Sequence, residues 1–177
     1  VDQLRQRLAT AAWPTPPSSF GIEDEFALFG SFVSGPKALT TFAGAAPANT
    51  DDHPVVAYRA PGITYAPDSR PRDRLIALLG ELKVQPTDIA TENAKNVASA
   101  SDAAWRRRIT AYWAARDRFI RVGRAVRPSA EARDMLAQVR ESLLSVLRIS
   151  PDFRPAYGPV FKMATALART DAVRAAA

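Results

Sequence analysis

Apolar residues recur at steps of three and four along the chain after residue 101, a spacing typical of amphipathic α-helices. This pattern predicts three helices, over residues 102–126, 129–149 and 153–169. Pro128 and Pro151 separate them, because proline cannot continue a helix, and the short connections turn each helix back along its neighbour. We therefore expect a consecutive antiparallel stack, with an interior formed by Trp105, Ile109, Trp113, Leu136, Val139, Leu143, Tyr157 and Val160.

The helix predicted over residues 153–169 has an apolar side that no following helix in the pattern would cover. We expect this side to be covered by residues 170–177, by a second copy of the chain, or by the region near Phe29 and Phe42. A homo-oligomer is therefore among the expected assemblies.

In the first part of the chain the sequence predicts shorter helices and one short strand. Helices are predicted from Glu23 to Phe29, with acidic residues in the first turn, and from Pro36 onward. Residues 54–59 form a short β-branched run that begins at a proline, which is typical of a strand. The predicted fold is therefore mostly α, an antiparallel helical stack with one short strand region near residues 54–59. We expect an accessory segment over residues 1–70 and a helical module over residues 71–177.

The composition is that of an ordinary soluble globular protein, with 177 residues of which 47% are hydrophobic and 24% charged. Uninterrupted apolar runs are only a few residues long, whereas a membrane-spanning helix needs about 20 residues, so no transmembrane segment is predicted. The chain has no cysteine and a single histidine, His53. These counts exclude a disulfide framework, a thiolate nucleophile and a zinc site built from several histidines. We expect no metal and no cofactor.

The single histidine lies in an unusual polar segment, Asn-Thr-Asp-Asp-His-Pro, over residues 49–54. One interpretation makes Asp51, Asp52 and His53 a ligand-binding site for a cationic amine or a metal, with His53 as an acid or base. Adjacent side chains point to opposite sides of an extended chain, so the two carboxylates converge only at a sharp turn. The favoured interpretation is structural, because Asn, Thr and Asp side chains often close turns on nearby backbone N–H groups.

Charge is distributed unevenly along the chain. Residues 1–100 contain 9 basic and 11 acidic side chains, whereas residues 101–177 contain 15 basic and 7 acidic ones, which favours an acidic partner for the second part. Six arginines on the helix predicted over residues 102–126 are candidate contacts to a polyanion or a partner protein: Arg106, Arg107, Arg108, Arg118, Arg121 and Arg124. The aromatic residues beside them have core spacing, so a solvated face or a protein contact is favoured. A basic helical nucleic-acid-binding protein is the alternative.

The sequence SLLSVLRISPDFRPAYGPVFKMATALARTD, over residues 142–171, resembles the junction between two tetratricopeptide repeats. In that 34-residue pattern an apolar helix ends before a proline, and an aromatic and a small residue open the next helix. Here Pro151 separates the two sets of matching positions, which are Val139, Leu143 and Val146 before it and Tyr157, Val160 and Ala164 after it. Phe161 departs from the pattern, since the repeat prefers glycine there. The resemblance implies at most one and a half repeats, which act through protein–protein contacts.

The segment from Phe26 to Pro61 is similar to one in bacterial spermidine synthase-like proteins. In that family a Gly-Pro-x-Ala-Leu helix leads to Asn-Thr-Asp-Asp-x-Pro and then to a strand that ends in Ala-Pro. The matching residues are Gly35, Pro36, Ala38, Leu39, Asn49, Thr50, Asp51, Asp52, Pro54, Arg59, Ala60 and Pro61. The resemblance implies that the nucleotide-binding sheet and the catalytic residues of the family lie upstream of Val1.

No catalytic residue of that family can be placed on this sequence, since no glycine-rich turn follows a predicted strand. The resemblance therefore implies a non-catalytic accessory or scaffold module of a spermidine synthase-like protein. Its expected partner is its own upstream catalytic domain or another protein. The implied location is cytoplasmic, and an upstream region could attach the protein to the inner membrane. An aminopropyltransferase active in its own right is the less favoured alternative.

Overall fold

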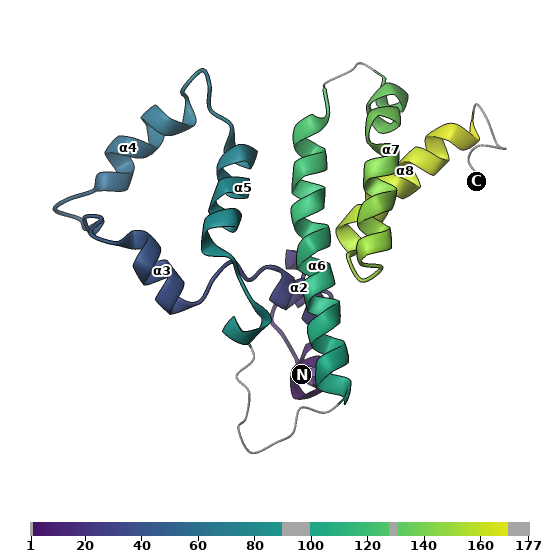
Figure 1. Ribbon diagram of the computed structural model, residues 1–177, viewed down its shortest axis with the longest axis horizontal. Coiled ribbons are helices and arrows are strands. Elements are labelled where there is room, and N and C mark those ends of the chain that lie inside the picture. The colour runs from purple at the N-terminus through teal and green to yellow at the C-terminus, as the bar shows by residue number, and fades with distance from the viewer. Residues whose placement is uncertain (1, 90–99, 128–130, 170–177) are drawn as a thin grey trace. The chain divides into compact units, whose positions relative to one another are not determined.

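The computed structural model describes residues 2–89, 100–127 and 131–169. These residues form eight α-helices, three short 3-10 helices and no β-strand (Figure 1), so the predicted mostly-α fold is confirmed. The α-helices are α1 (Asp2–Thr10), α2 (Glu25–Gly30), α3 (Pro36–Ala43), α4 (Val55–Thr64), α5 (Pro71–Leu82), α6 (Ala100–Ala125), α7 (Ala132–Ile149) and α8 (Tyr157–Ala168). The 3-10 helices are η1 (Pro17–Phe20), η2 (Pro86–Asp88) and η3 (Arg154–Ala156).

The chain divides into two compact units. Unit 1 comprises Val1–Phe32 and Gln85–Ala177, and unit 2 comprises Val33–Val84. The predicted boundary between residues 70 and 71 falls within unit 2, between α4 and α5.

The strand predicted near residues 54–59 is wrong, because these residues belong to α4. A short β-branched run beside a proline resembles a strand, but a strand needs a neighbouring strand to pair its backbone, and the described residues contain none. A helix instead satisfies these backbone groups within the segment. Pro54 lies just before the first turn of α4. The N–H groups at this end of a helix have no carbonyl acceptor within the helix, so a proline there removes no helical hydrogen bond. The helix also continues through Pro61.

Helices α6, α7 and α8 of unit 1 pack consecutively, as predicted. Helix α7 contacts both α6 and α8, and in Figure 1 it runs back along α6. Helix α6 begins two residues before the predicted start, and α8 begins four residues after it, because η3 precedes it. The predicted break at Pro128 lies outside the described residues.

The interior of this stack contains a cluster of three buried residues, Val122, Val139 and Leu143, against which Phe119, Val126 and Val160 pack. Most of the residues predicted to be internal are buried: Trp105, Ile109, Trp113, Val139 and Leu143. The other three, Leu136, Tyr157 and Val160, are partly exposed. Two of these three lie on α8, where Met163 is the only buried residue, so α8 is the least covered helix of the stack.

Aromatic rings join α2 to α6 at a second part of the interior of unit 1. The rings of Phe26 and Tyr112 stack at a centroid distance of 6.4 Å, and Phe29 meets Trp105 edge to face at 5.4 Å. Phe153, just before η3, contacts Tyr112 at 5.1 Å. The aromatic residues of α6 therefore form core contacts, which accounts for their helical spacing.

Unit 2 has little interior of its own. Leu79 and Leu82, both on α5, are its buried residues, and neither α3 nor α4 contains a buried residue. Within the part of the chain that is described, no helix combines the length and the apolar character that crossing a bilayer requires.

Candidate functional site

The polar segment at residues 49–53 forms a turn at the start of α4. Thr50 and His53 exchange backbone hydrogen bonds of 3.2 and 3.1 Å, and the Thr50 hydroxyl also accepts from the His53 N–H at 3.1 Å. The side-chain oxygen of Asn49 accepts from the N–H of Val56 at 2.9 Å, which satisfies one unpaired donor in the first turn of α4. Asn49 and Thr50 thus close the turn, and the turn leads into helix α4 instead of the predicted strand.

The three candidate ligand-binding residues of this segment, Asp51, Asp52 and His53, are all exposed. No hydrogen bond or ion pair links the two carboxylates to another described residue, and no metal-binding group of three or more His, Cys, Asp or Glu side chains is formed by the described residues. The turn therefore presents two separate solvated carboxylates.

One of the six candidate arginines, Arg108, makes contacts that stabilise the fold of unit 1. Its guanidinium donates two hydrogen bonds to the carboxylate of Asp152, at 3.0 and 2.7 Å. The same guanidinium lies 4.3 Å from the ring centre of Phe26, which is within the range of a cation–π contact. The hydrogen bonds that Arg108 donates to the Asp152 carboxylate raise the pKa of Arg108 above its ordinary value, so this cation is fixed between α2 and the turn before η3.

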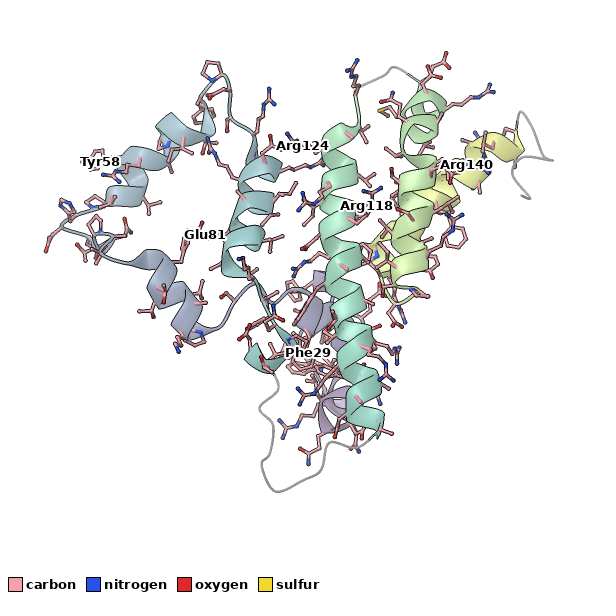
Figure 2. All side chains as sticks on the ribbon, viewed as in Figure 1. Phe29, Tyr58, Glu81, Arg118, Arg124 and Arg140 are labelled. Carbon is pink, nitrogen blue, oxygen red and sulfur yellow. The ribbon has the colours of Figure 1, made fainter. Side chains whose placement is uncertain are left out.

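The other five candidate arginines differ in their surroundings. Arg107, Arg118 and Arg121 are exposed, and Arg118 and Arg124 leave α6 in different directions (Figure 2). Arg106 and Arg124 each have an interaction within the protein. Arg107, Arg118 and Arg121 are therefore the solvated cations among the six candidates. The three neighbouring rings of Trp105, Tyr112 and Trp113 are buried and cannot stack on nucleic-acid bases.

Arg116, which the sequence pattern did not single out, holds the end of α2. It donates to the carbonyl oxygens of Gly30 at 2.8 Å and Phe32 at 3.0 Å, and the indole N–H of Trp113 donates to the carbonyl of Phe29 at 3.1 Å. These bonds bind carbonyl groups at the end of α2 and just beyond it, where the helix supplies few N–H donors. The partners are more than 80 residues apart, so helical periodicity gives no sign of them.

A small polar hollow of about 150 Å³ lies in unit 1, lined by Gly21, Glu23, Asp24, Ala27, Tyr112, Asp152, Arg154 and Pro155. Its charges are already compensated. Arg154 lies 2.6 Å from Glu23 and 3.6 Å from Asp24, while Arg108 binds Asp152. Burial raises the pKa of Tyr112 to about 12, with a further contribution from the Asp24 carboxylate, so its hydroxyl stays protonated at neutral pH. Each of the three carboxylates in the hollow is thus paired with an arginine.

Helix α4 has an unusual surface for the part of the chain that the structure describes, because apolar side chains point outward on opposite sides of it. Val56 and Ile63 are seven residues apart on one side, Tyr58 lies about half a turn away from them, and Tyr65 follows directly as the C-cap of the helix. All four are exposed, the two tyrosines by 82% and 84%. An apolar helix of this kind is ordinarily surrounded by protein.

Hydrogen bonds hold both ends of α4 within unit 2. Asn49 binds its first turn, and the guanidinium of Arg74 on α5 donates to the carbonyl oxygen of Ile63 at 3.4 Å. On α3, Leu39 and Phe42 are also about half exposed. The exposed apolar residues of α3 and α4 form the candidate interaction surface of the protein.

No protein-family model matches this chain, and neither the curated proteins nor the solved structures contain a significant match to it.

Proposed function

We propose that this chain is a non-catalytic interaction module, in which the exposed apolar residues of α3 and α4 bind a partner protein. The observation that carries the proposal is the exposure of Val56, Ile63, Tyr58 and Tyr65 on opposite sides of α4. A short helix gains most of its stability from packing an apolar face, and α4 contains no buried residue. A partner that covers α4 would supply the missing contacts.

We further propose that the partner is a spermidine synthase-like catalytic domain. This part of the proposal is supported by the resemblance of residues 26–61 to a segment of such proteins, because α3 and residues 55–61 of α4 lie within that segment. A domain-to-domain interface of this kind contains aromatic residues at its centre, and Tyr58 and Tyr65 are suited to that position. In this proposal unit 1 is the stable helical scaffold to which unit 2 is joined.

Photo-crosslinking in the native host tests the proposal. A benzophenone amino acid at Tyr58 should give one discrete adduct, which mass spectrometry identifies as a spermidine synthase-like domain. The matched control is Glu81, an exposed polar residue of α5 in the same unit; both positions are labelled in Figure 2. A double substitution of Val56→Asp and Ile63→Asp should abolish the adduct. Equal adducts at Tyr58 and Glu81, or none at Tyr58, would refute the proposal.

Calorimetry distinguishes the module from an enzyme. The proposal assigns no aminopropyl transfer to this chain, so decarboxylated S-adenosylmethionine should produce no binding heat. Binding at micromolar concentration would instead favour an aminopropyltransferase active in its own right.

A further inference from the structure

A groove of about 260 Å³ lies between α7 and α8 of unit 1. It is lined by Arg133, Leu136, Ala137, Arg140, Met163, Ala166 and Leu167. Five of these side chains are apolar, and the two arginines are the charged members of the lining. On α8 the lining residues follow the spacing of one helix face, and this face is turned toward α7.

The two arginines are placed at a regular interval. They are seven residues apart on α7, which is two helical turns and about 10 Å along the axis. Arg133 is exposed. Arg140, labelled in Figure 2, is 40% exposed, and the carboxylate of its neighbour Glu141 is 4.0 Å away, at the limit of an ion pair. Such an exposed pair contributes little, so both guanidinium groups are available for bidentate contact with carboxylates.

The dimensions of the groove favour a helix over a small molecule. Pockets that enclose small ligands have volumes of about 300–1,000 Å³ and bury most of the ligand surface. This groove is smaller, is partly open to solvent and takes its lining from two helices. A groove between two helices accepts the apolar face of a third helix, with apolar residues at every third or fourth position.

We infer that this groove binds an acidic amphipathic helix of a partner protein. Apolar residues of that helix would contact Leu136, Ala166 and Leu167, and carboxylates seven residues apart at the edge of its apolar face would bind Arg133 and Arg140. Residues 101–177 contain 15 basic against 7 acidic side chains, so the surrounding field favours an acidic helix and disfavours a basic one. The site lies in unit 1 and uses no residue of α3 or α4. A result that refutes this inference therefore does not refute the proposed function, and the reverse also holds.

Fluorescence anisotropy of a labelled, hydrocarbon-stapled peptide tests the inference with the full chain. The peptide has leucines at every third or fourth position of one face and two glutamates seven residues apart at its edge. The control peptide has lysines in place of the two glutamates. We expect the acidic peptide to bind at least about tenfold more tightly, which corresponds to about 1.4 kcal/mol. Equal affinities, or no binding of either peptide, would overturn the inference.

Charge reversal of the groove provides the decisive comparison. Arg133→Glu with Arg140→Glu should exchange the preference, so that the lysine peptide binds more tightly than the glutamate peptide. Arg148→Glu, an exposed arginine on α7 that does not line the groove, should leave the preference unchanged. Circular dichroism establishes that each variant is folded. An unchanged preference in the folded double variant would overturn the inference.

Two other occupants give different results. If a second copy of the chain fills the groove, sedimentation shows a dimer that Arg133→Glu with Arg140→Glu dissociates. If residues 170–177 fill it, a chain ending at Arg169 gains about tenfold or more in affinity for both peptides. Either result overturns the assignment to a partner helix.

Discussion

The backbone of Gly30 on α2 lies directly against the ring of Tyr112 on α6. A Cβ atom at position 30 would lie only 2.7 Å from Cδ1 of that ring, and Tyr112 is itself buried. Gly30→Ala should therefore separate α2 from α6 and lower the free energy of unfolding by about 1–3 kcal/mol, the usual cost of overpacking. Urea denaturation followed by circular dichroism measures this change. Gly158→Ala on α8 is the matched control, because a Cβ there meets no atom within 4 Å; an equal loss in both variants would contradict the contact.

The interior of the stack gives a second prediction. Leu143 is 3% exposed and belongs to the buried cluster with Val122 and Val139. Leu143→Ala should leave a cavity between α6 and α7 and destabilise the protein by about 2–5 kcal/mol in urea denaturation. Ile149→Ala, at a side chain that is 40% exposed on the same helix, should cost less than half as much. A smaller effect at Leu143 than at Ile149 would show that α7 does not pack through this face.

Sequence periodicity was sufficient for the helices of the stack because they are long and have a continuous apolar face. Over the 26 residues of α6, several turns repeat the same pattern, so local composition cannot hide it. For α4 the window is only 10 residues, and its β-branched start favoured a strand. What decided the outcome was the absence of a partner strand among the described residues, which a local pattern does not reveal.

The contacts that hold unit 1 together were less predictable than its helices. The sequence pattern predicts that Arg108 is part of a cationic face, whereas it binds Asp152, 44 residues away, and lies over Phe26. The pattern does not indicate a role for Arg116, although it binds two carbonyl groups at and just beyond the end of α2. An arginine on a helix looks the same in sequence whether it faces water or a distant carbonyl, so only the tertiary structure separates the two roles.

The ion pair between Glu25 and Arg5 predicts a pH dependence of stability. Burial of Glu25 alone would raise its pKa, but the hydrogen bond from Arg5, with backbone and charge contributions, brings the pKa below its ordinary value of 4.5. Ionised Glu25 therefore stabilises the folded state at pH above 4.5, and this contribution is lost as the pH falls through the lower folded-state pKa. Glu25→Gln should flatten the decline of the urea midpoint over that acid range. Glu141→Gln, at a side chain that is 77% exposed, is the control; an equal decline in wild type and Glu25→Gln would contradict the prediction.

The turn before α4 predicts different effects for two neighbouring polar residues. Asn49 accepts a hydrogen bond from the N–H of Val56, whereas Asp51 is exposed and makes no such bond. Asn49→Ala should destabilise the start of α4 by about 0.5–2 kcal/mol, as for a lost capping residue. Hydrogen exchange at the Val56 amide should become faster in Asn49→Ala and remain unchanged in Asp51→Ala. If Asp51→Ala instead abolished binding of an amine or a metal without changing exchange, the ligand-site interpretation would be correct.

The solvated cations of α6 predict only weak, salt-sensitive binding to nucleic acid. Arg107 and Arg118 are eleven residues apart, which places them on one side of the helix, and Arg121 lies one turn further along. Each cation that contacts a phosphate contributes about −0.9 to the slope of log affinity against log salt, so these three arginines predict a slope no steeper than about −3. The neighbouring aromatic rings are buried, so single-stranded oligonucleotides should bind no better than duplexes.

Anisotropy titrations of a labelled duplex between about 50 and 200 mM salt measure the slope, and replacing the three arginines by glutamate should abolish binding. Tight binding at the higher salt, with a preference for single strands, would contradict this prediction and favour a nucleic-acid-binding function.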